Sequence, residues 1–370
     1  MIVRFSVLLT AALVPAAAQA QLLAMPFKGE DLAPGERLVT DKHGDDTRHP
    51  QYNGKDIIVT RHIGDGKWSR FRTANGKRGV NSDHLAYNKP IYAMAPGRVV
   101  GCWRNAPENP DPPAHSDTYK AGRIPGAGNF VEIRHDDGNV ALYAHAIPGT
   151  IPAAICPHNG TLVPAARNSD GSLKRFEDGT VESDISGTVV TGGVRVAAGQ
   201  FIGRVGNSGS SSDPHLHVHI DSLGANRGTP IVMNFARGLS TPATGDGLGE
   251  KANINGPWTR VAGGPLPRRR VLVWPARTAG NATWNGISAG AFQRTFEHFT
   301  DSGMMPDKIS CRNGGKTYDS TWVPAVGAFI THHGMTPMDY AAKNNQYRGQ
   351  GYRLASMSQC GMTVVAVWRK

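Results

Sequence analysis

Three histidines at every second position, His215, His217 and His219, have the spacing that most clearly suggests chemistry. Successive side chains of a β-strand point to opposite faces, so on a strand these three imidazoles share one face. Their Cα atoms would lie roughly 6.5–7 Å apart, which lets neighbouring rings share a metal ion or a water molecule. The alternative is three histidines on an exposed sheet face. The Gly/Ser-rich loop at residues 206–212, directly before the strand, favours a site over this alternative.

Other segments occur ahead of these histidines in a recognisable order. Residues 90–100 read PIYAMAPGRVV, and residues 128–145 run from GNFVEIRHDDG to a Tyr-Ala-His ending at His145. Together with the His-x-His of residues 215–217, this set over residues 80–220 resembles the lysostaphin-like (LytM-domain) zinc endopeptidases. The resemblance implies a mostly β N-terminal domain with an antiparallel sheet, the duplicated hybrid motif. It also implies an exported hydrolase that cleaves peptidoglycan peptides with a zinc-activated water.

The resemblance also implies roles for individual residues. His217 corresponds to a zinc ligand, and His145 and His215 correspond to the histidines that assist the water and stabilise the oxyanion. The family carries His-x-Gly-x-Asp shortly before the segment that starts at Pro90. The aligned residues here are GVNSD at 79–83, so the aspartate ligand is kept as Asp83 but Gly79 replaces the ligand histidine.

The missing ligand leaves two classes of function open. In the first, His219 serves as a surrogate ligand because it shares a face with His217, whereas alternation points His84 away. The second is a degenerate LytM-like domain that binds peptidoglycan or regulates a partner cell-wall hydrolase. A purely structural envelope protein would explain the C-terminal repeats but not the histidines. His62 and Asp65 imitate a metal motif with a spacing one residue short, so we do not place them in the site.

Residues 1–20 have the features of a secretory signal peptide. Arg4 gives a basic start, an apolar stretch follows, and Ala18-Gln-Ala20 is typical of a cleavage site. We therefore expect an exported protein, periplasmic or secreted, with no transmembrane segment. The net charge of +11 predicts an acidic partner such as peptidoglycan carboxylates. Export, and the lack of a basic cluster interleaved with aromatics, argue against nucleic acid.

The sequence predicts four parts: the signal peptide, a metallopeptidase domain at 21–235, a linker at 236–268 and tandem repeats at 269–370. Residues 21–55 are polar and punctuated by Pro and Gly, which indicates an extended leading segment. Residues 286–292 align with 334–340, and Ser288 and Thr336 stand at helix N-cap positions. Each predicted helix is followed by two strands, so we expect a smaller α+β domain of helix-strand-strand units about 48 residues long. These units resemble bacterial tandem repeats found beside secreted hydrolases.

Four cysteines in an exported protein indicate up to two disulfides, for which three pairings exist. Cys102 and Cys156 both fall in insertions of the first domain. Cys311 and Cys360 fall at nearly equivalent points of the two repeats. We therefore predict the pairings Cys102–Cys156 and Cys311–Cys360.

Overall fold

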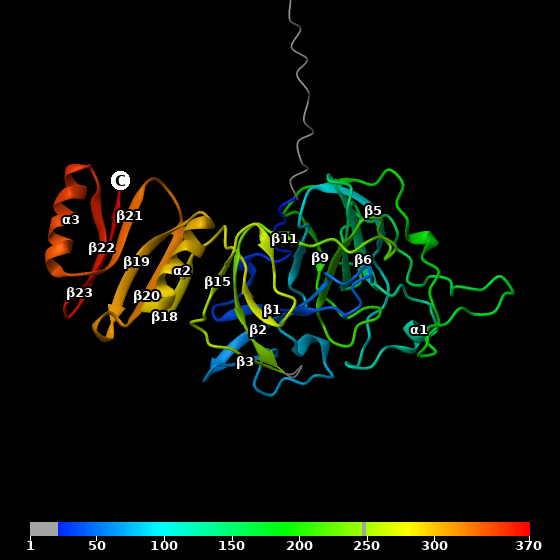
Figure 1. Ribbon diagram of the computed structural model, residues 1–370. Helices are drawn as coiled ribbons and strands as arrows, with labels where there is room; N and C mark the ends of the chain where they lie inside the picture. The colour runs from blue at the N-terminus through cyan, green and yellow to red at the C-terminus, as the bar shows by residue number, and fades with distance from the viewer. Residues whose placement is uncertain (1–20, 246–248) are drawn as a thin grey trace, which may run out of the picture.

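The computed structural model describes residues 21–245 and 249–370, so the predicted signal peptide lies outside the described residues. A β-rich N-terminal part is followed by two smaller units that extend to one side of it, with α3 (Pro337–Gly349) at the far end (Figure 1). Within the described ranges, no helix has the length and apolar character needed to cross a bilayer.

The N-terminal part is organised on a 13-stranded antiparallel sheet, whose main path is β15-β12-β17-β1-β2-β10-β7-β6-β5-β8. Three further strands, β3, β13 and β14, extend it beside β2. The strands are β1 (Glu36–Lys42), β2 (Lys55–Gly64), β3 (Lys67–Ser69), β5 (Gly97–Trp103), β6 (Asn129–His135), β7 (Val140–Ala146), β8 (Arg195–Val196), β10 (Leu216–Asp221), β12 (Gly238–Pro242), β13 (Thr244–Gly245), β14 (Gly249–Lys251), β15 (Thr259–Val261) and β17 (Val271–Trp274).

Short elements complete this part of the chain. They are the pair β4 (Pro90–Tyr92) and β9 (Phe201–Arg204), the pair β11 (Asn234–Phe235) and β16 (Gly264–Pro265), helix α1 (Asp117–Lys120), and the 3-10 turns η1 (Gly29–Asp31), η2 (Asn81–Asp83) and η3 (Ser186–Thr188). Ser116 caps α1 by accepting a hydrogen bond from the Tyr119 N–H.

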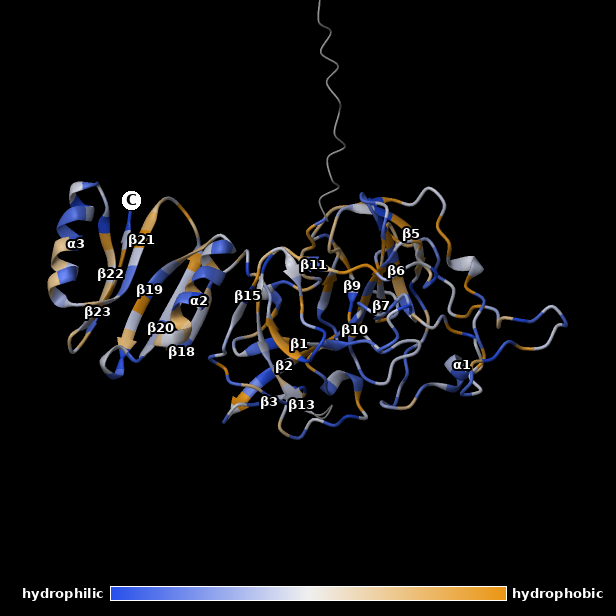
Figure 2. Cartoon of the chain, in the orientation of Figure 1, coloured by the Kyte–Doolittle hydropathy of each residue, from blue (hydrophilic) through white to orange (hydrophobic). Residues whose placement is uncertain are grey.

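The core lies between the main sheet and the β4–β9 ribbon. Leu216, Val218 and Ile220 of β10 alternate with the histidines and belong to a buried apolar cluster with Ile57 of β2. The buried Tyr143 hydroxyl oxygen accepts a hydrogen bond of 2.7 Å from the Met94 backbone N–H. Figure 2 shows the hydrophobic residues gathered along strands such as β2 and β6. One face of β10 is thereby fixed to the core, and the histidine face is left for the site.

Two segments that lack a strand pattern in the sequence belong to the main sheet. The predicted linker at 236–268 contains β12 and β15, which pair with each other, and β12 also pairs with β17. The extended leading segment contains β1, which lies between β17 and β2. Strand β12 reads GLSTP and β15 has only three residues, so their pairing follows from backbone hydrogen bonds that composition does not reveal. The prediction of a linker at 236–268 is therefore corrected, because strands from this segment belong to the main sheet of the first domain.

The C-terminal part consists of two similar units. The first contains β18 (Ala282–Ser288), α2 (Ala289–Asp301), β19 (Met304–Arg312), η4 (Asn313–Gly315) and β20 (Thr317–Pro324), and the second contains β21 (Phe329–Met335), α3, β22 (Arg353–Cys360) and β23 (Thr363–Arg369). Their sheets have the matching orders β18-β20-β19 and β21-β23-β22. Each unit thus has a strand before its helix that the sequence pattern did not show.

The predicted N-cap residues and cysteine pairings can be compared with the structure. Thr336 forms a capping box with Asp339, whereas Ser288 occupies the N-cap of α2 without a side-chain hydrogen bond. Both predicted disulfides are confirmed. Cys102 is bonded to Cys156, and the bond between Cys311 and Cys360 joins β19 of the first unit to β22 of the second.

Candidate metal centre

The candidate site is built on three neighbouring strands, β1, β2 and β10. The Cα partner of His217 on β10 is Asp56 at the start of β2, and the partner of Asp56 on β1 is Asp41. Directly opposite residues of an antiparallel pair project to the same face of a sheet, so His217 and Asp56 must meet. His43 follows the end of β1 and reaches the same carboxylate from the other side.

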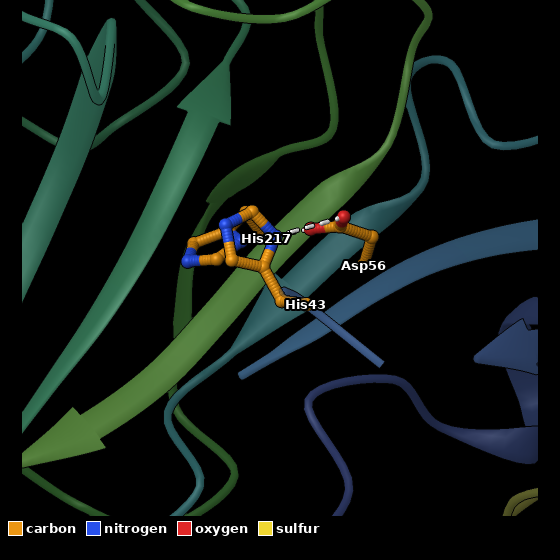
Figure 3. Close-up of side chains that lie close together, drawn as sticks. All are labelled: His43, Asp56 and His217. Atoms are coloured by element: carbon orange, nitrogen blue, oxygen red, sulfur yellow. Dashed lines mark hydrogen bonds and ion pairs between the residues drawn. The ribbon is translucent and has the colours of Figure 1, made fainter. Parts of the chain in front are cut away.

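Asp56 contacts two histidines through its two carboxylate oxygens (Figure 3). Its Oδ1 lies 2.8 Å from His217 Nδ1, and its Oδ2 lies 3.1 Å from His43 Nδ1. The ligand atoms of the three residues all lie within 4.8 Å of one another. The His217 side chain is only 5% exposed, but Asp56 is 37% and His43 36% exposed, so one side of the cluster faces solvent.

The ionisation states of Asp56 and His217 suit a metal ligand. Burial alone would raise the pKa of the Asp56 carboxyl, but hydrogen bonds from His217 and His43 outweigh burial and hold this pKa well below its usual range. Burial lowers the pKa of His217 to about 4, against the opposing effect of Asp56. An ionised carboxylate and a neutral imidazole are the forms that bind metal. The hydrogen bond to Asp56 raises the pKa of His43, so metal binding there competes with a proton.

His145 lies at the end of β7 beside this cluster. Its backbone has φ +68°, a left-handed conformation that is strained for a non-glycine residue and is often found at functional sites. Its Nδ1 lies 2.8 Å from the Ser208 carbonyl oxygen, which can only accept, so Nδ1 carries the proton. Burial, and then the nearby His215, hold the pKa of His145 well below its usual value. The ring is therefore neutral, with Nε2 as its proton acceptor.

His215 completes the group of histidines. Its Nδ1 lies 2.7 Å from the Asp213 carbonyl oxygen, and its Nε2 lies 3.6 Å from Asp56 Oδ1. The ring centroids of His215 and His145 are 4.8 Å apart. The structure therefore brings His145, His215 and His217 together, as the sequence predicts for these three.

The structure does not bring Asp83 to the cluster. Asp83 lies in η2, where its carboxylate accepts a hydrogen bond of 2.8 Å from the Lys77 backbone N–H. His84 is also directed elsewhere, because its Nε2 contacts the Arg78 carbonyl. The carboxylate beside His217 is that of Asp56, which corrects the position given to Asp83. The resemblance predicts the motif shortly before Pro90, at residues 79–83, whereas the rest of β2, β3 and the loop after them separate Asp56 from that strand.

His219 lies behind His217 rather than beside Asp56. Its Nδ1 is 2.9 Å from Nε2 of His217, the nitrogen opposite to the one that faces Asp56. His219 is therefore not part of the group of potential ligand atoms, which consists of His43, Asp56 and His217.

The sequence around Asp56 contains part of the metal-binding motif of the lysostaphin-like family that the chain resembles. Residues 52–56 read Tyr-Asn-Gly-Lys-Asp, which keeps the Gly-x-Asp half of the family motif directly before the apolar start of β2. Tyr52 stands where the motif has histidine, and the Arg268 guanidinium lies 3.5 Å from the centre of its ring. Gly54 permits a close approach, because a Cβ there would lie 3.3 Å from His217 Cε1 and 2.8 Å from the Gln51 carbonyl oxygen. The second imidazole beside Asp56 is that of His43, which no spacing rule indicated.

Two imidazole nitrogens and one carboxylate oxygen are the donors that zinc takes in catalytic sites with three protein ligands. The second nitrogen of His217 already has a hydrogen-bond partner, as is usual for a metal-ligating histidine. The exposed sides of His43 and Asp56 leave room for a fourth ligand. The residues present therefore fit a zinc-type site.

Comparisons with known proteins give one family model and several solved structures. The model of a polyglycine hydrolase-like structural repeat matches residues 326–370, which contain the second C-terminal unit. No curated protein matches the chain.

Among solved structures, the chain is similar to the catalytic domain of the prophage-encoded M23 protein EnpA from Enterococcus faecalis (17% identity, 60% of this chain and 95% of that chain, TM-score 0.24). It is similar to the catalytic domain of the antimicrobial peptidase lysostaphin from Staphylococcus simulans (19% identity, 45% and 85%, TM-score 0.21). It is also similar to a zinc containing peptidase from Vibrio cholerae (16% identity, 48% of each chain, TM-score 0.20).

Proposed function

We propose that this protein is an exported zinc-dependent peptidase of the lysostaphin type that hydrolyses peptide bonds in peptidoglycan. The observation that carries this proposal is the contact of one carboxylate, Asp56, with two histidines from neighbouring strands, His43 and His217. Beside it stand two further histidines whose Nδ1 atoms are fixed by backbone carbonyls. The residues proposed as ligands and as proton-transfer groups therefore lie close together, with His43 and Asp56 on the partly exposed side.

His43, Asp56 and His217 are the residues that would hold the metal. A bound zinc ion polarises a carbonyl and lowers the pKa of a water molecule toward neutrality. His145, kept neutral by burial, accepts the proton of the attacking water at Nε2. His215, whose Nε2 lies 3.6 Å from Asp56 Oδ1, is the second candidate for proton transfer and would donate to the departing amine.

Three features support the substrate class and the compartment. The ordered motifs over residues 80–220 are those of peptidoglycan peptidases, and the net charge of +11 favours an acidic polymer. Two disulfides are typical of proteins that fold in an oxidising compartment. The signal-peptide features of residues 1–20 agree with export.

A second function is favoured by the state of His43. Its pKa is raised by the hydrogen bond to Asp56, so a protonated His43 opposes metal binding. In addition, Tyr52 replaces the motif histidine. In this second function the domain binds peptidoglycan, or a partner cell-wall hydrolase, without cleaving it.

Metal content and hydrolysis of purified peptidoglycan separate the two functions. We expect the mature protein to bind one zinc ion per chain and to release free amino groups from sacculi. Chelation should abolish this release and added zinc should restore it. His43→Ala should lose both zinc and activity, whereas His49→Ala, in the exposed part of the same loop, should retain both. Sedimentation with sacculi in a zinc-free form that releases no amino groups would establish the binding function instead.

A further inference from the structure

We propose that Arg268 is a positioning residue that attaches the loop carrying His43 to the main sheet, so that this imidazole stays beside Asp56. The inference rests on the proposed function, in which His43 would hold a metal ion. The loop comprises residues 43–53 and joins β1 to β2. Residues 44–49 are all exposed, so no buried apolar side chain of theirs sets the place of the loop. Its place depends on polar contacts with the rest of the chain.

Most hydrogen bonds of the loop lie within the loop itself. The backbone N–H groups of His49, Tyr52 and Gly54 each donate to the carbonyl oxygen three residues earlier, so the segment is a series of turns. Among the described residues, the Asn53 side chain reaches outside the loop to the Pro230 carbonyl oxygen, but at the long distance of 3.5 Å. The turns give the loop its shape and do not attach it to the sheet.

The Arg268 guanidinium joins both ends of the loop. Its Nη2 donates a hydrogen bond of 2.7 Å to the Gly44 carbonyl oxygen, and its Nη1 donates to the Tyr52 carbonyl oxygen. The guanidinium also lies 3.5 Å from the centre of the Tyr52 ring, which adds a cation–π contact. The planar fork of arginine reaches two carbonyl oxygens at once, a geometry that a lysine ammonium does not offer. Because Gly44 directly follows His43, this attachment acts on the residue next to the imidazole.

The residues next to Arg268 are themselves fixed to the strands of the site. The Pro267 carbonyl oxygen accepts a hydrogen bond of 2.7 Å from Lys55 Nζ, at the start of β2. Arg270 forms an ion pair of 3.0 Å with Asp41 of β1. One short segment before β17 therefore contacts β1, the loop and β2, so Arg268 is a firm point of attachment.

His43 is the one proposed ligand that does not lie on a strand. Asp56 belongs to β2 and His217 to β10, whereas His43 follows the end of β1. Ordering a mobile loop at the moment of binding costs free energy, which a loop already in place avoids. Arg268 is not among the potential ligand residues, so it would act through the position of His43.

Arg268→Met tests this role, and Arg269→Met is its matched control. Methionine keeps part of the aliphatic chain but donates no hydrogen bond. Arg269 is exposed and makes no hydrogen bond or ion pair within the described part of the chain. We expect zinc affinity, measured by chelator competition, to fall about 10- to 100-fold in Arg268→Met, as for the loss of other outer partners of metal ligands. The control should keep the wild-type affinity. Wild-type affinity in Arg268→Met would overturn the proposed role.

Two substitutions at Tyr52 test the ring contact separately. Tyr52→Phe keeps a ring beside the guanidinium, whereas Tyr52→Leu removes the ring and leaves the backbone carbonyl oxygen in place. We expect wild-type zinc affinity in the phenylalanine variant. The leucine variant should bind zinc more weakly, though less so than Arg268→Met, because the two carbonyl hydrogen bonds remain. Equal affinity in the two Tyr52 variants would overturn the part given to the ring.

Hydrogen–deuterium exchange of the metal-free protein gives a readout that does not depend on zinc. The N–H groups of Tyr52 and Gly54 are bonded within the loop, so their exchange reports its opening. We expect this exchange to be about 5- to 30-fold faster in Arg268→Met, the effect of losing two hydrogen bonds of ordinary strength. Exchange should be unchanged in Arg269→Met, and the amides of β6 and β7 should stay protected in every variant.

The exchange experiment also separates this inference from the proposed function. Unchanged exchange at Tyr52 and Gly54 in Arg268→Met would contradict the attachment of the loop by Arg268. A wild type that binds no zinc, but whose loop exchange depends on Arg268 as expected, would overturn the proposed function and leave the attachment established.

Discussion

Asp56 is the residue on which the candidate site depends, because its two oxygens contact two histidines from different segments of the chain. Burial lowers the pKa of His217 to about 4, and the hydrogen bond to Asp56 raises the pKa of the half-exposed His43. The carboxylate is ionised because these two hydrogen bonds outweigh its burial. Removing it leaves two imidazoles without the acceptor that aligns their Nδ1 atoms.

Asp56→Asn should therefore weaken zinc binding by more than the roughly 10- to 100-fold that loss of an outer partner costs. The amide keeps the size of the side chain but loses the negative charge and one acceptor. Asp83→Asn is the matched control, because Asp83 lies in η2 with its carboxylate on the Lys77 N–H. Isothermal titration of both variants with zinc measures the difference. Loss of zinc binding in Asp83→Asn alone would reverse the assignment of the carboxylate.

His145→Asn and His215→Asn should each lower the rate of peptidoglycan hydrolysis by about 10²- to 10⁴-fold while zinc remains bound. Asparagine is chosen at 145 because it tolerates the left-handed backbone found there. Initial rates and zinc stoichiometry would be measured on the same samples. Near-normal rates in either variant would remove that histidine from the site.

At the scale of elements, the register of β1, β2 and β10 sets the site. Asp56 lies opposite His217 only in the observed pairing, and a shift of one residue would turn every side chain of β2 to the other face. The apolar residues on the opposite face of β10 fix that register by packing into the core. Gly54 lies directly ahead of β2 and lets the two strands approach at this point.

Gly54→Ala tests this close approach. Its Cβ would lie 2.8 Å from the Gln51 carbonyl oxygen and 3.3 Å from both His217 Cε1 and His219 Cβ. The backbone must shift to admit it, so we expect a loss of about 1–3 kcal/mol in the free energy of unfolding and weaker zinc binding. In Gly187→Ala the new Cβ meets no atom within 4 Å, and this control should change neither quantity. Denaturant unfolding and zinc titration provide the two measurements.

At the scale of the whole molecule, the first repeat unit packs directly on the main sheet. Trp274 of β17 contacts His298 and Phe299 of α2, with ring centroids 5.0 and 5.3 Å apart. The buried Arg37 guanidinium lies 3.6 Å from the centre of the same Trp274 ring. One apolar cluster includes residues of both parts. The main-sheet domain and the repeat units therefore share a core.

This junction should respond to acid through His298. Burial, and then Arg37, lower the pKa of His298 to about 3, below the value near 6.5 expected in the unfolded chain. A group with a lowered folded pKa contributes stability above pH 6.5 and loses it progressively as the pH falls toward 3. At pH 4.5 the loss is about 2–3 kcal/mol.

His298→Leu should accordingly flatten the pH dependence of stability between pH 7 and pH 4.5, measured by thermal unfolding with tryptophan fluorescence. His158→Leu is the control, because the His158 ring lies in the insertion after β7, where Nε2 contacts the Val189 carbonyl. That variant should keep the pH dependence of the wild type. Identical pH profiles for the wild type and His298→Leu would show that the junction does not titrate.

Features that depend on local periodicity could be predicted from the sequence alone. The spacing of His215, His217 and His219 required a common face, and the repeated glycines and N-caps located both C-terminal units. The four cysteines, read by their places in insertions and repeats, gave the two confirmed disulfides. The mostly β character also followed from composition and motif order. Each of these properties is encoded within a few residues or within one repeat length.

The tertiary structure decided which residues meet. His217 and Asp56 are separated by 161 positions, and only the pairing of β10 with β2 places them opposite each other. His43 enters the site because β1 ends beside Asp56, which no motif records. Likewise β12 and β15 form strands because neighbours supply their hydrogen bonds. Strand register depends on packing across the whole sheet, so the ligand carboxylate could not be chosen from spacing along the chain.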